Sequence, residues 1–263
     1  MIKVMRMTVC LWLSSMTIQC NSQNLDYDLN NPNHRVRLSG ELDEISGMTT
    51  LSDSIIAAVQ DEKGRIYYLD ARTGAVMYQI DFGKDGDFEG ITYGQKMLYM
   101  LRSDGAIFRF DEKENIQEYQ FKHSKHFDFE GLCFDGQNRR ILVACKEHGD
   151  KDERDHFFIY SFSLESNRYE KKPAYKIKRN QVHKKFKPSG IAIHPNGNIY
   201  IVSSFSKTLL VLDVEGVILH IVQLNEQLFS QPEGVAFDTF GNLFISNEKQ
   251  DRASDILRFN FLH

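Results

Sequence analysis

Side-chain oxygens recur at one position of a repeated sequence motif. Five segments of the chain share a motif that ends in glycine, and the residue just before that glycine is a glutamate or a serine. These residues are Ser46, Glu89, Glu130, Ser189 and Glu233. Carboxylates that converge repel one another, so they need protonation, a cationic partner or a metal ion. Because carboxylate and hydroxyl oxygens suit a hard cation, we predict a calcium site at Glu89, Glu130 and Glu233.

Six further acidic residues stand at two other positions of the same repeats. One set lies two residues before the glutamate or serine, and the other follows the second apolar run of its repeat. The first set is Glu44, Asp87 and Asp128, and the second is Asp61, Glu147 and Glu248. We expect all of them to reach the face of the calcium site and to bind ligand there. Zinc is not expected, since the chain has no cysteine or histidine cluster with zinc spacing.

The sequence carries none of the common hydrolase signatures. It lacks Gly-x-Ser-x-Gly, His-Glu-x-x-His and a phosphate-binding glycine-rich loop. We therefore assign no catalytic residue. A metal-dependent hydrolase also needs a base near its ion, and the histidines that come into question for this role are His126, His148 and His194.

The elements that carry these residues are short β-strands. The motif glycines are 43, 41, 59 and 44 residues apart, and apolar runs of β-type period follow each of them. Turn signals such as Asn196-Gly197 separate the runs. Four short strands per unit at this period are typical of a β-propeller blade. Equivalent positions at the start of each innermost strand should converge on one mouth of the central channel. In an alternative interpretation, the glutamates cap backbone amides of the neighbouring blade and hold the ring together.

We predict an all-β fold, a β-propeller of five blades with four antiparallel strands each. The fifth repeat stops at His263 without an outermost strand, and His34–Leu42 has the strand pattern to supply it. Pairing the two chain ends closes the ring and leaves no open edge. The propeller domain then spans residues 34–263. Six blades are the alternative, which requires a blade with no visible repeat.

The third repeat is the longest. Its extra residues include a charged loop, Glu147–His156, and the connection around the expected fourth strand, Ala174–Lys178. From Lys171 to Lys187 there are eight lysines or arginines and no acidic residue. A solvated outer strand is the first interpretation of this run, and docking against an anionic membrane surface is the second.

The first twenty residues differ in character from the rest. Lys3 and Arg6 precede an apolar run that ends at Cys20. We predict that residues 1–20 are a signal peptide of the lipoprotein type, that Cys20 is lipidated, and that residues 21–33 are a linker. Gln19 departs from the small residue that such signals carry before the cysteine. The predicted location is the bacterial cell envelope, with a lipid anchor in the membrane. A plain secretion signal, and a periplasmic or secreted protein, is the alternative.

Composition narrows the class of protein and its partners. The chain has 263 residues, 41% of them hydrophobic, and a formal net charge of −4. These values indicate a folded globular protein and give no reason to expect nucleic acid as a partner. We expect a monomer that binds a small molecule or an envelope protein. Cys133 and Cys145 follow the predicted signal, and hairpin geometry places them too far apart for a disulfide.

The repeat motifs resemble those of a known family. Asp-Glu-Ile-Ser-Gly, Asp-Phe-Glu-Gly-Ile and Asp-Phe-Glu-Gly-Leu, followed by Ile-Tyr-Tyr-Leu-Asp and Ile-Phe-Arg-Phe-Asp, are similar to the SdiA-regulated propeller family over residues 38–263. The last two repeats, which begin at Gly190 and Gly234, also resemble NHL-type propeller repeats. The resemblance implies an envelope location and a calcium-associated propeller, and it implies no settled activity.

Two classes of function are compatible with these observations. The first is a non-catalytic propeller that binds a ligand or partner at an acidic, calcium-binding channel face. The second is a calcium-dependent hydrolase of the lactonase, esterase or phytase type, in which the ion polarises a carbonyl or phosphoryl oxygen. Since no histidine stands at an inner position of the repeats, binding is placed first.

Overall fold

A computed structural model describes residues 25–262 of the chain, except 112, 123–125 and 149. The predicted signal peptide and Cys20 lie outside the described residues. Within the described part, the chain forms strands and three short 3-10 helices and no α-helix. None of the described helices is long and apolar enough to cross a membrane.

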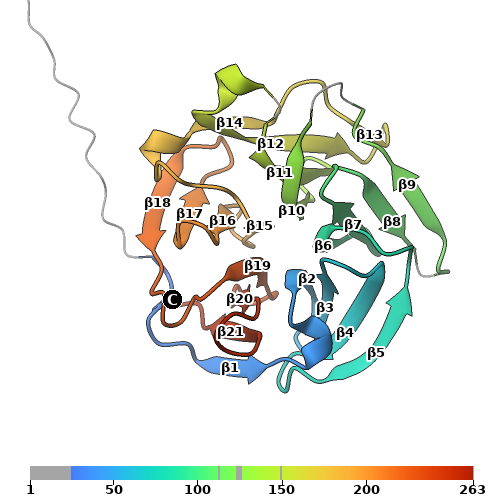
Figure 1. Cartoon of the computed structure of the whole chain (residues 1–263), viewed down its shortest axis with the longest axis vertical. Coiled ribbons are helices and arrows are strands. Elements are labelled where there is room, and N and C mark those ends of the chain that lie inside the picture. The colour runs from blue at the N-terminus through green and yellow to red at the C-terminus, as the bar shows by residue number, and fades with distance from the viewer. Residues whose placement is uncertain (1–24, 112, 123–125, 149, 263) are drawn as a thin grey trace, which may run out of the picture.

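Five antiparallel sheets surround a central channel, so the predicted five-bladed propeller is confirmed (Figure 1). Blades 1 and 2 contain eight strands in chain order. These are β2 (Ile45–Ser52), β3 (Ile55–Gln60), β4 (Arg65–Asp70), β5 (Val76–Asp81), β6 (Phe88–Gly94), β7 (Met97–Arg102), β8 (Ile107–Phe110) and β9 (Ile116–Tyr119).

Blades 3 and 4 contain the next nine strands. These are β10 (Asp128–Asp135), β11 (Arg140–Glu147), β12 (His156–Ser163), β13 (Arg168–Tyr169), β14 (Tyr175–Lys178), β15 (Gly190–Ile193), β16 (Ile199–Ser203), β17 (Thr208–Leu212) and β18 (Ile218–Gln223). The outer edge of blade 3 differs from the expectation of one fourth strand. Both β13 and β14 pair with β12, because β12 is long enough to take a short partner at each end.

Blade 5 joins the two ends of the described chain. It consists of β19 (Pro232–Phe237), β20 (Leu243–Asn247), β21 (Asp255–Phe259) and β1 (His34–Arg37). Strand β1 pairs with β21 from His34 opposite Arg258 to Arg37 opposite Asp255, which confirms the predicted closure. The closing strand is shorter than predicted, since the chain turns after Arg37 into a 3-10 helix, Gly40–Leu42, that buries Leu42.

The apolar core lies between neighbouring blades. Five clusters of buried side chains fill the spaces between adjacent sheets. Because a middle strand is covered on both faces, every residue of β16 and β17 is buried, whereas the outer strand β18 alternates in exposure. Tyr27 and Leu29 complete the cluster between blades 4 and 5, and the Tyr27 hydroxyl donates to the Gly241 carbonyl at 2.5 Å. The segment before β1 therefore packs onto the propeller.

The motif glycines stand where innermost strands of neighbouring blades come closest. A Cβ atom on Gly47 would lie 2.5 Å from the Gly90 Cα, and one on Gly190 would collide with the Glu233 carbonyl oxygen. On Gly131 it would lie 3.0 Å from the Gly190 Cα. Any side chain at these positions would push two blades apart. The repeated glycine is thus explained by the narrow channel, and the residue before it takes a fixed place on the channel wall.

Cys133 and Cys145 are buried and not bonded to each other. Cys133 pairs with Leu142 in the β10–β11 hairpin, as the sequence predicts. Burial raises the pKa of the Cys145 thiol to about 12, so it stays a thiol at neutral pH.

Candidate functional site

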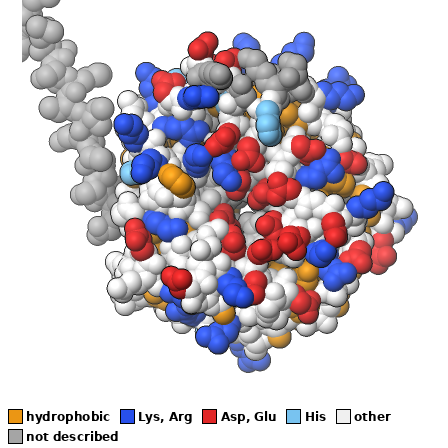
Figure 2. Space-filling model, viewed as in Figure 1, with side chains coloured by type: hydrophobic (Ala, Val, Ile, Leu, Met, Phe, Trp, Pro, Cys, Tyr) orange, Lys and Arg blue, Asp and Glu red, His pale blue; other side chains and the backbone are white. Residues whose placement is uncertain are grey.

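Strand register gathers the predicted acidic residues at one end of the channel. In each blade the start of the innermost strand lies opposite the end of the second strand. Asp128 pairs with Glu147 in blade 3, and Ile45, the residue after Glu44, pairs with Gln60, the residue before Asp61. Figure 2 shows acidic side chains grouped over the centre of this face. We call this end of the ring the acidic mouth, and its residues are Glu44, Asp61, Asp87, Glu89, Asp128, Glu130, Glu233 and Glu248.

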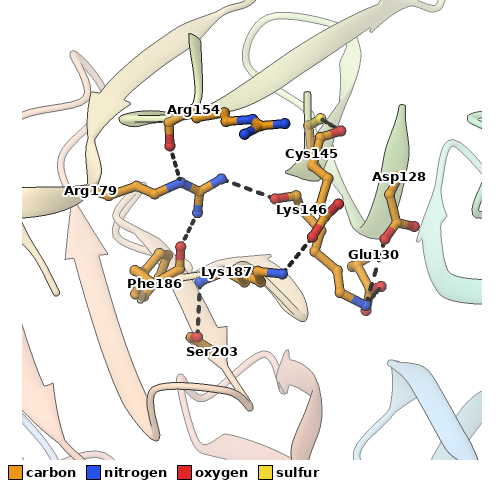
Figure 3. A network of polar contacts seen from close by, with 10 residues as sticks. Asp128, Glu130, Cys145, Lys146, Arg154, Arg179, Phe186, Lys187 and Ser203 are labelled. Atoms are coloured by element: carbon orange, nitrogen blue, oxygen red, sulfur yellow. Dashed lines mark hydrogen bonds and ion pairs between the residues drawn. The ribbon is translucent and has the colours of Figure 1, made fainter. Parts of the chain in front are cut away.

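Glu130 has a cationic partner that we did not predict. Its buried carboxylate accepts a hydrogen bond from the Lys146 ammonium group, which also lies 3.7 Å from the Asp128 carboxylate (Figure 3). Burial raises the pKa of Glu130 to about 7, and Lys146 works against a larger rise. Lys146 supplies part of the positive charge that convergent carboxylates require.

A finer comparison of the repeats would have found Lys146. We compared the residues that follow the second strands, such as Asp61 and Glu147, but not the residues one position earlier. That earlier residue is Gln60, Ser103, Lys146, Ser203 or Asn247 in the five repeats. A lysine among neutral residues at one repeated position was the available signal.

Lys146 forms its ion pairs with Glu130 and Asp128 and not with the carboxyl groups of Glu89 and Glu233. Burial, then the neighbouring charges of Glu130 and Asp87, raise the pKa of Glu89 far above its usual range. Burial raises the pKa of Glu233 to about 8, against hydrogen bonds from Ser189 and Ser204. Both carboxyl groups therefore stay protonated near neutral pH unless a cation joins them.

Asp61 lies in a second part of the acidic mouth, beside Glu44 and Glu248. Its Oδ1 atom is buried and accepts no hydrogen bond from an N–H or hydroxyl group of the described residues. Burial, the charge of Glu44, a hydrogen bond with the Glu44 carboxyl group and the charge of Glu248 raise the pKa of Asp61 to about 7. Asp61 and Glu44 therefore share a proton near neutral pH, and an added cation can take the place of that proton.

One predicted site residue, Glu147, and one serine at the repeated position, Ser46, have structural partners. The Glu147 carboxylate pairs with the Lys187 ammonium at 2.5 Å, which lowers the pKa of Glu147 and turns this side chain toward blade 4. The Ser46 hydroxyl donates to the Phe88 carbonyl of the next blade at 2.6 Å. Serine at this position thus fastens neighbouring blades, which is the role that our alternative interpretation gave to the glutamates.

The donor set of the acidic mouth suits calcium in its chemistry. Two separate places in the acidic mouth offer oxygens to an added cation: the carboxyl groups of Glu89 and Glu233 near Glu130, and that of Asp61 near Glu44 and Glu248. The carboxylate oxygens of Glu89, Glu130 and Glu233 do not all lie within 4.8 Å of one another. The Glu130 carboxylate also already forms an ion pair with the Lys146 ammonium group. Among the described residues, the group that does meet this spacing is Glu153, Asp155 and His156, on the blade 3 loop. Calcium at the acidic mouth stays a prediction.

The histidines considered as a base lie in different places. His194 follows β15 at the end of the channel opposite the acidic mouth, is 3% exposed, and packs against Tyr27 and Phe237. His148 packs against Phe127 and Phe158. His194 therefore cannot serve chemistry at the acidic mouth.

Five antiparallel blades, four of them four-stranded and the ring closed by the N-terminal strand, define this chain as a small β-propeller with an acidic channel mouth. A family model described as SdiA-regulated matches residues 26–250. The chain belongs to the SdiA-regulated family.

Solved structures share the fold at low sequence identity. Glutaminyl cyclase from Myxococcus xanthus is 12% identical, with a TM-score of 0.62 over 88% of this chain and 95% of that one. The PQQ-bound aldose sugar dehydrogenase from Streptomyces coelicolor is 13% identical, with a TM-score of 0.59 over 88% and 97%. A chain of the nidogen/laminin complex is 13% identical, with a TM-score of 0.56 over 82% and 76%. No curated protein matches significantly. At such identities the likeness establishes the propeller fold alone.

Proposed function

We propose that this protein is a non-catalytic binding propeller of the bacterial cell envelope, which takes up a cation at its acidic mouth and binds a small molecule or envelope protein there. Calcium is the cation that we propose. One observation carries the proposal: the carboxyl groups of Glu89, Glu233 and Asp61 are enclosed at the acidic mouth while Lys146 pairs with Glu130. A divalent ion would remove their repulsion and present a charged centre to a ligand.

Binding is proposed ahead of hydrolysis because no histidine stands at an inner position of the repeats and His194 lies at the opposite end of the channel from the base that a calcium-dependent hydrolase needs. His126 and His148 lie nearer the acidic mouth, beside Asp128 and Glu147, and stay the candidates for a base in the hydrolase alternative. Propellers of similar shape include both enzymes and a partner of laminin, so the fold supports either class.

The test is the melting temperature of the purified protein in millimolar calcium and in EDTA. A ligand that binds the native state stabilises it by mass action, so calcium should raise the melting temperature. Glu233→Gln should reduce this rise, whereas Glu165→Gln, at an exposed turn of blade 3, should leave it unchanged. An identical melting temperature in calcium and EDTA would remove the metal from the proposal.

The envelope location rests on Cys20 and has its own test. We propose that Cys20 carries lipid and ties the propeller to the membrane. Cys20→Ala should then move the protein from the membrane fraction to the soluble fraction. Unchanged membrane association of the variant would contradict the anchor.

A further inference from the structure

A second pocket lies beside the acidic mouth and has the opposite charge. It has a volume of about 460 Å³ and lies between blades 3 and 4. Its lining includes five cationic residues and one phenylalanine, which are Arg154, Arg179, Lys184, Lys185, Lys187 and Phe205. Figure 2 shows lysine and arginine side chains next to the central acidic group on this face. We call it the basic pocket.

Arg179 fastens the walls of the basic pocket to one another. Its Nε donates to the Arg154 carbonyl at 3.2 Å, its Nη2 to the Lys146 carbonyl at 3.0 Å, and its Nη1 to the Phe186 carbonyl (Figure 3). Its own backbone amide donates to the Asp155 carbonyl at 2.8 Å. One side chain therefore ties the connection before blade 4 to both ends of the loop between β11 and β12, and its positive charge stays in the wall.

Positive charge in the basic pocket is largely uncompensated. Glu147 is the acidic residue in its described lining, and its carboxylate is taken by Lys187. Arg154, Lys184 and Lys185 are exposed and form no ion pair with described residues. Guanidinium and ammonium groups thus line one pocket without a counter-ion. Such a pocket favours an anion with several oxygens.

An aromatic side chain stands at the rim of the same pocket. Phe205 is 63% exposed, and the ammonium groups of Lys185 and Lys187 lie 6.0 and 5.6 Å from its ring centroid. A ring exposed to this degree among cations offers an apolar surface next to the anion site. It can stack against a ring of a bound molecule.

We infer that the basic pocket binds the phosphate group of an organic phosphomonoester, with the organic part against Phe205. A phosphate dianion matches the surplus positive charge better than a single carboxylate does. The basic pocket adjoins the acidic mouth through Lys146, which lines the pocket and pairs with Glu130. Its free cations are Arg154, Lys184 and Lys185, so the inference does not rest on a cation bound at the mouth.

Calorimetric titration of the purified full chain with inorganic phosphate and with phenyl phosphate tests the inference. Both should bind, and phenyl phosphate should bind more tightly. The double variant Lys184→Ala/Lys185→Ala should weaken both by about tenfold or more. Phe205→Ala should remove the preference for phenyl phosphate and keep phosphate binding. The matched control is Lys171→Ala/Lys172→Ala, which removes the same charge at the outer edge of blade 3 and should change neither affinity.

The phosphate group can come from a soluble molecule or from a lipid headgroup. Vesicles of phosphatidic acid, whose headgroup is a phosphomonoester, and of phosphatidylcholine, added as competitors of phenyl phosphate, distinguish the sources. Displacement by phosphatidic acid alone would identify a lipid headgroup, and no displacement would identify a soluble phosphomonoester. Absence of phenyl phosphate binding, or equal weakening by the control variant, would overturn the inference.

Discussion

At the scale of single residues, the charge balance of the acidic mouth depends on Lys146. The side chain of Lys146 is 35% exposed, whereas the side chain of its partner Glu130 is 8% exposed. Removal of the lysine leaves a buried acidic group without a counter-ion, which is more destabilising than loss of an exposed pair.

Lys146→Met should therefore destabilise the protein by about 1–2 kcal/mol, after allowance for the partial exposure of the lysine. Calcium should then stabilise this variant more than it stabilises the parent, because Glu130 becomes available to the ion. Urea unfolding with and without calcium measures both effects. Lys249→Met is the control, since it breaks an exposed pair with Asp43 and should change stability by less than about 0.5 kcal/mol. A Lys146 variant as stable as the control would contradict this role.

Glu233 should make the stability of the calcium-free protein depend on pH. Its pKa is raised to about 8 in the folded state, so the native protein keeps a proton that the unfolded chain loses above its ordinary pKa. The free energy of unfolding should thus fall as pH rises from about 5 to about 8, by about 1 kcal/mol per pH unit. Unfolding in EDTA at several pH values tests this, and Glu233→Gln should flatten the slope. Stability that rises over this interval would show that the carboxyl group is ionised in the fold.

At the scale of strands and motifs, the blades could be predicted from the spacing of the sequence repeats. The five blades were predicted from the spacing of the motif glycines, and the chain-end closure was recognised because one repeat lacked a strand. The split edge of blade 3 was missed, since two-residue strands such as β13 leave no periodic signal. The Lys146–Glu130 pair is set by local side-chain geometry, and the basic pocket by the hydrogen bonds of Arg179 between distant segments. Neither this ion pair nor the basic pocket can be predicted from the period of the strands or from the turn residues.

Gly190 tests the physical reason for the repeated glycine. A methyl group there would collide with the Glu233 carbonyl oxygen of the next blade, so Gly190→Ala should destabilise the protein by about 2–3 kcal/mol. Gly83→Ala is a suitable control, because nothing lies within 4 Å of a Cβ built at that position. Denaturant midpoints of the two variants should differ clearly. Equal midpoints would mean that the blades can move apart at little cost.

At the scale of the whole molecule, β1 completes the ring by covering the edge of β21. Arg35 pairs with Asp255 at 2.5 Å, and the Asp255 side chain is 2% exposed and also accepts from Asn247. The contact between first and last strands thus combines backbone pairing with a buried charge.

Deletion of residues 21–37 should therefore expose an unpaired strand and leave Asp255 without its cation. We expect oligomers or aggregates in size-exclusion chromatography and a loss of stability of several kcal/mol, on the order of that for a broken buried ion pair. Arg35→Met alone should destabilise less than the deletion and should keep the protein monomeric. A truncated protein that remained monomeric and fully stable would show that β1 is dispensable.

The pairing of Arg35 with Asp255 also dictates when the protein can finish folding. These residues are 220 positions apart in sequence, so their contact forms only after nearly the whole propeller has been made. Blades 1 to 4 can form in order as the chain emerges, but the last blade must wait for its C-terminal strands. The propeller therefore stays incomplete until β21 has been made, and the high contact order of this pairing makes the final step slow.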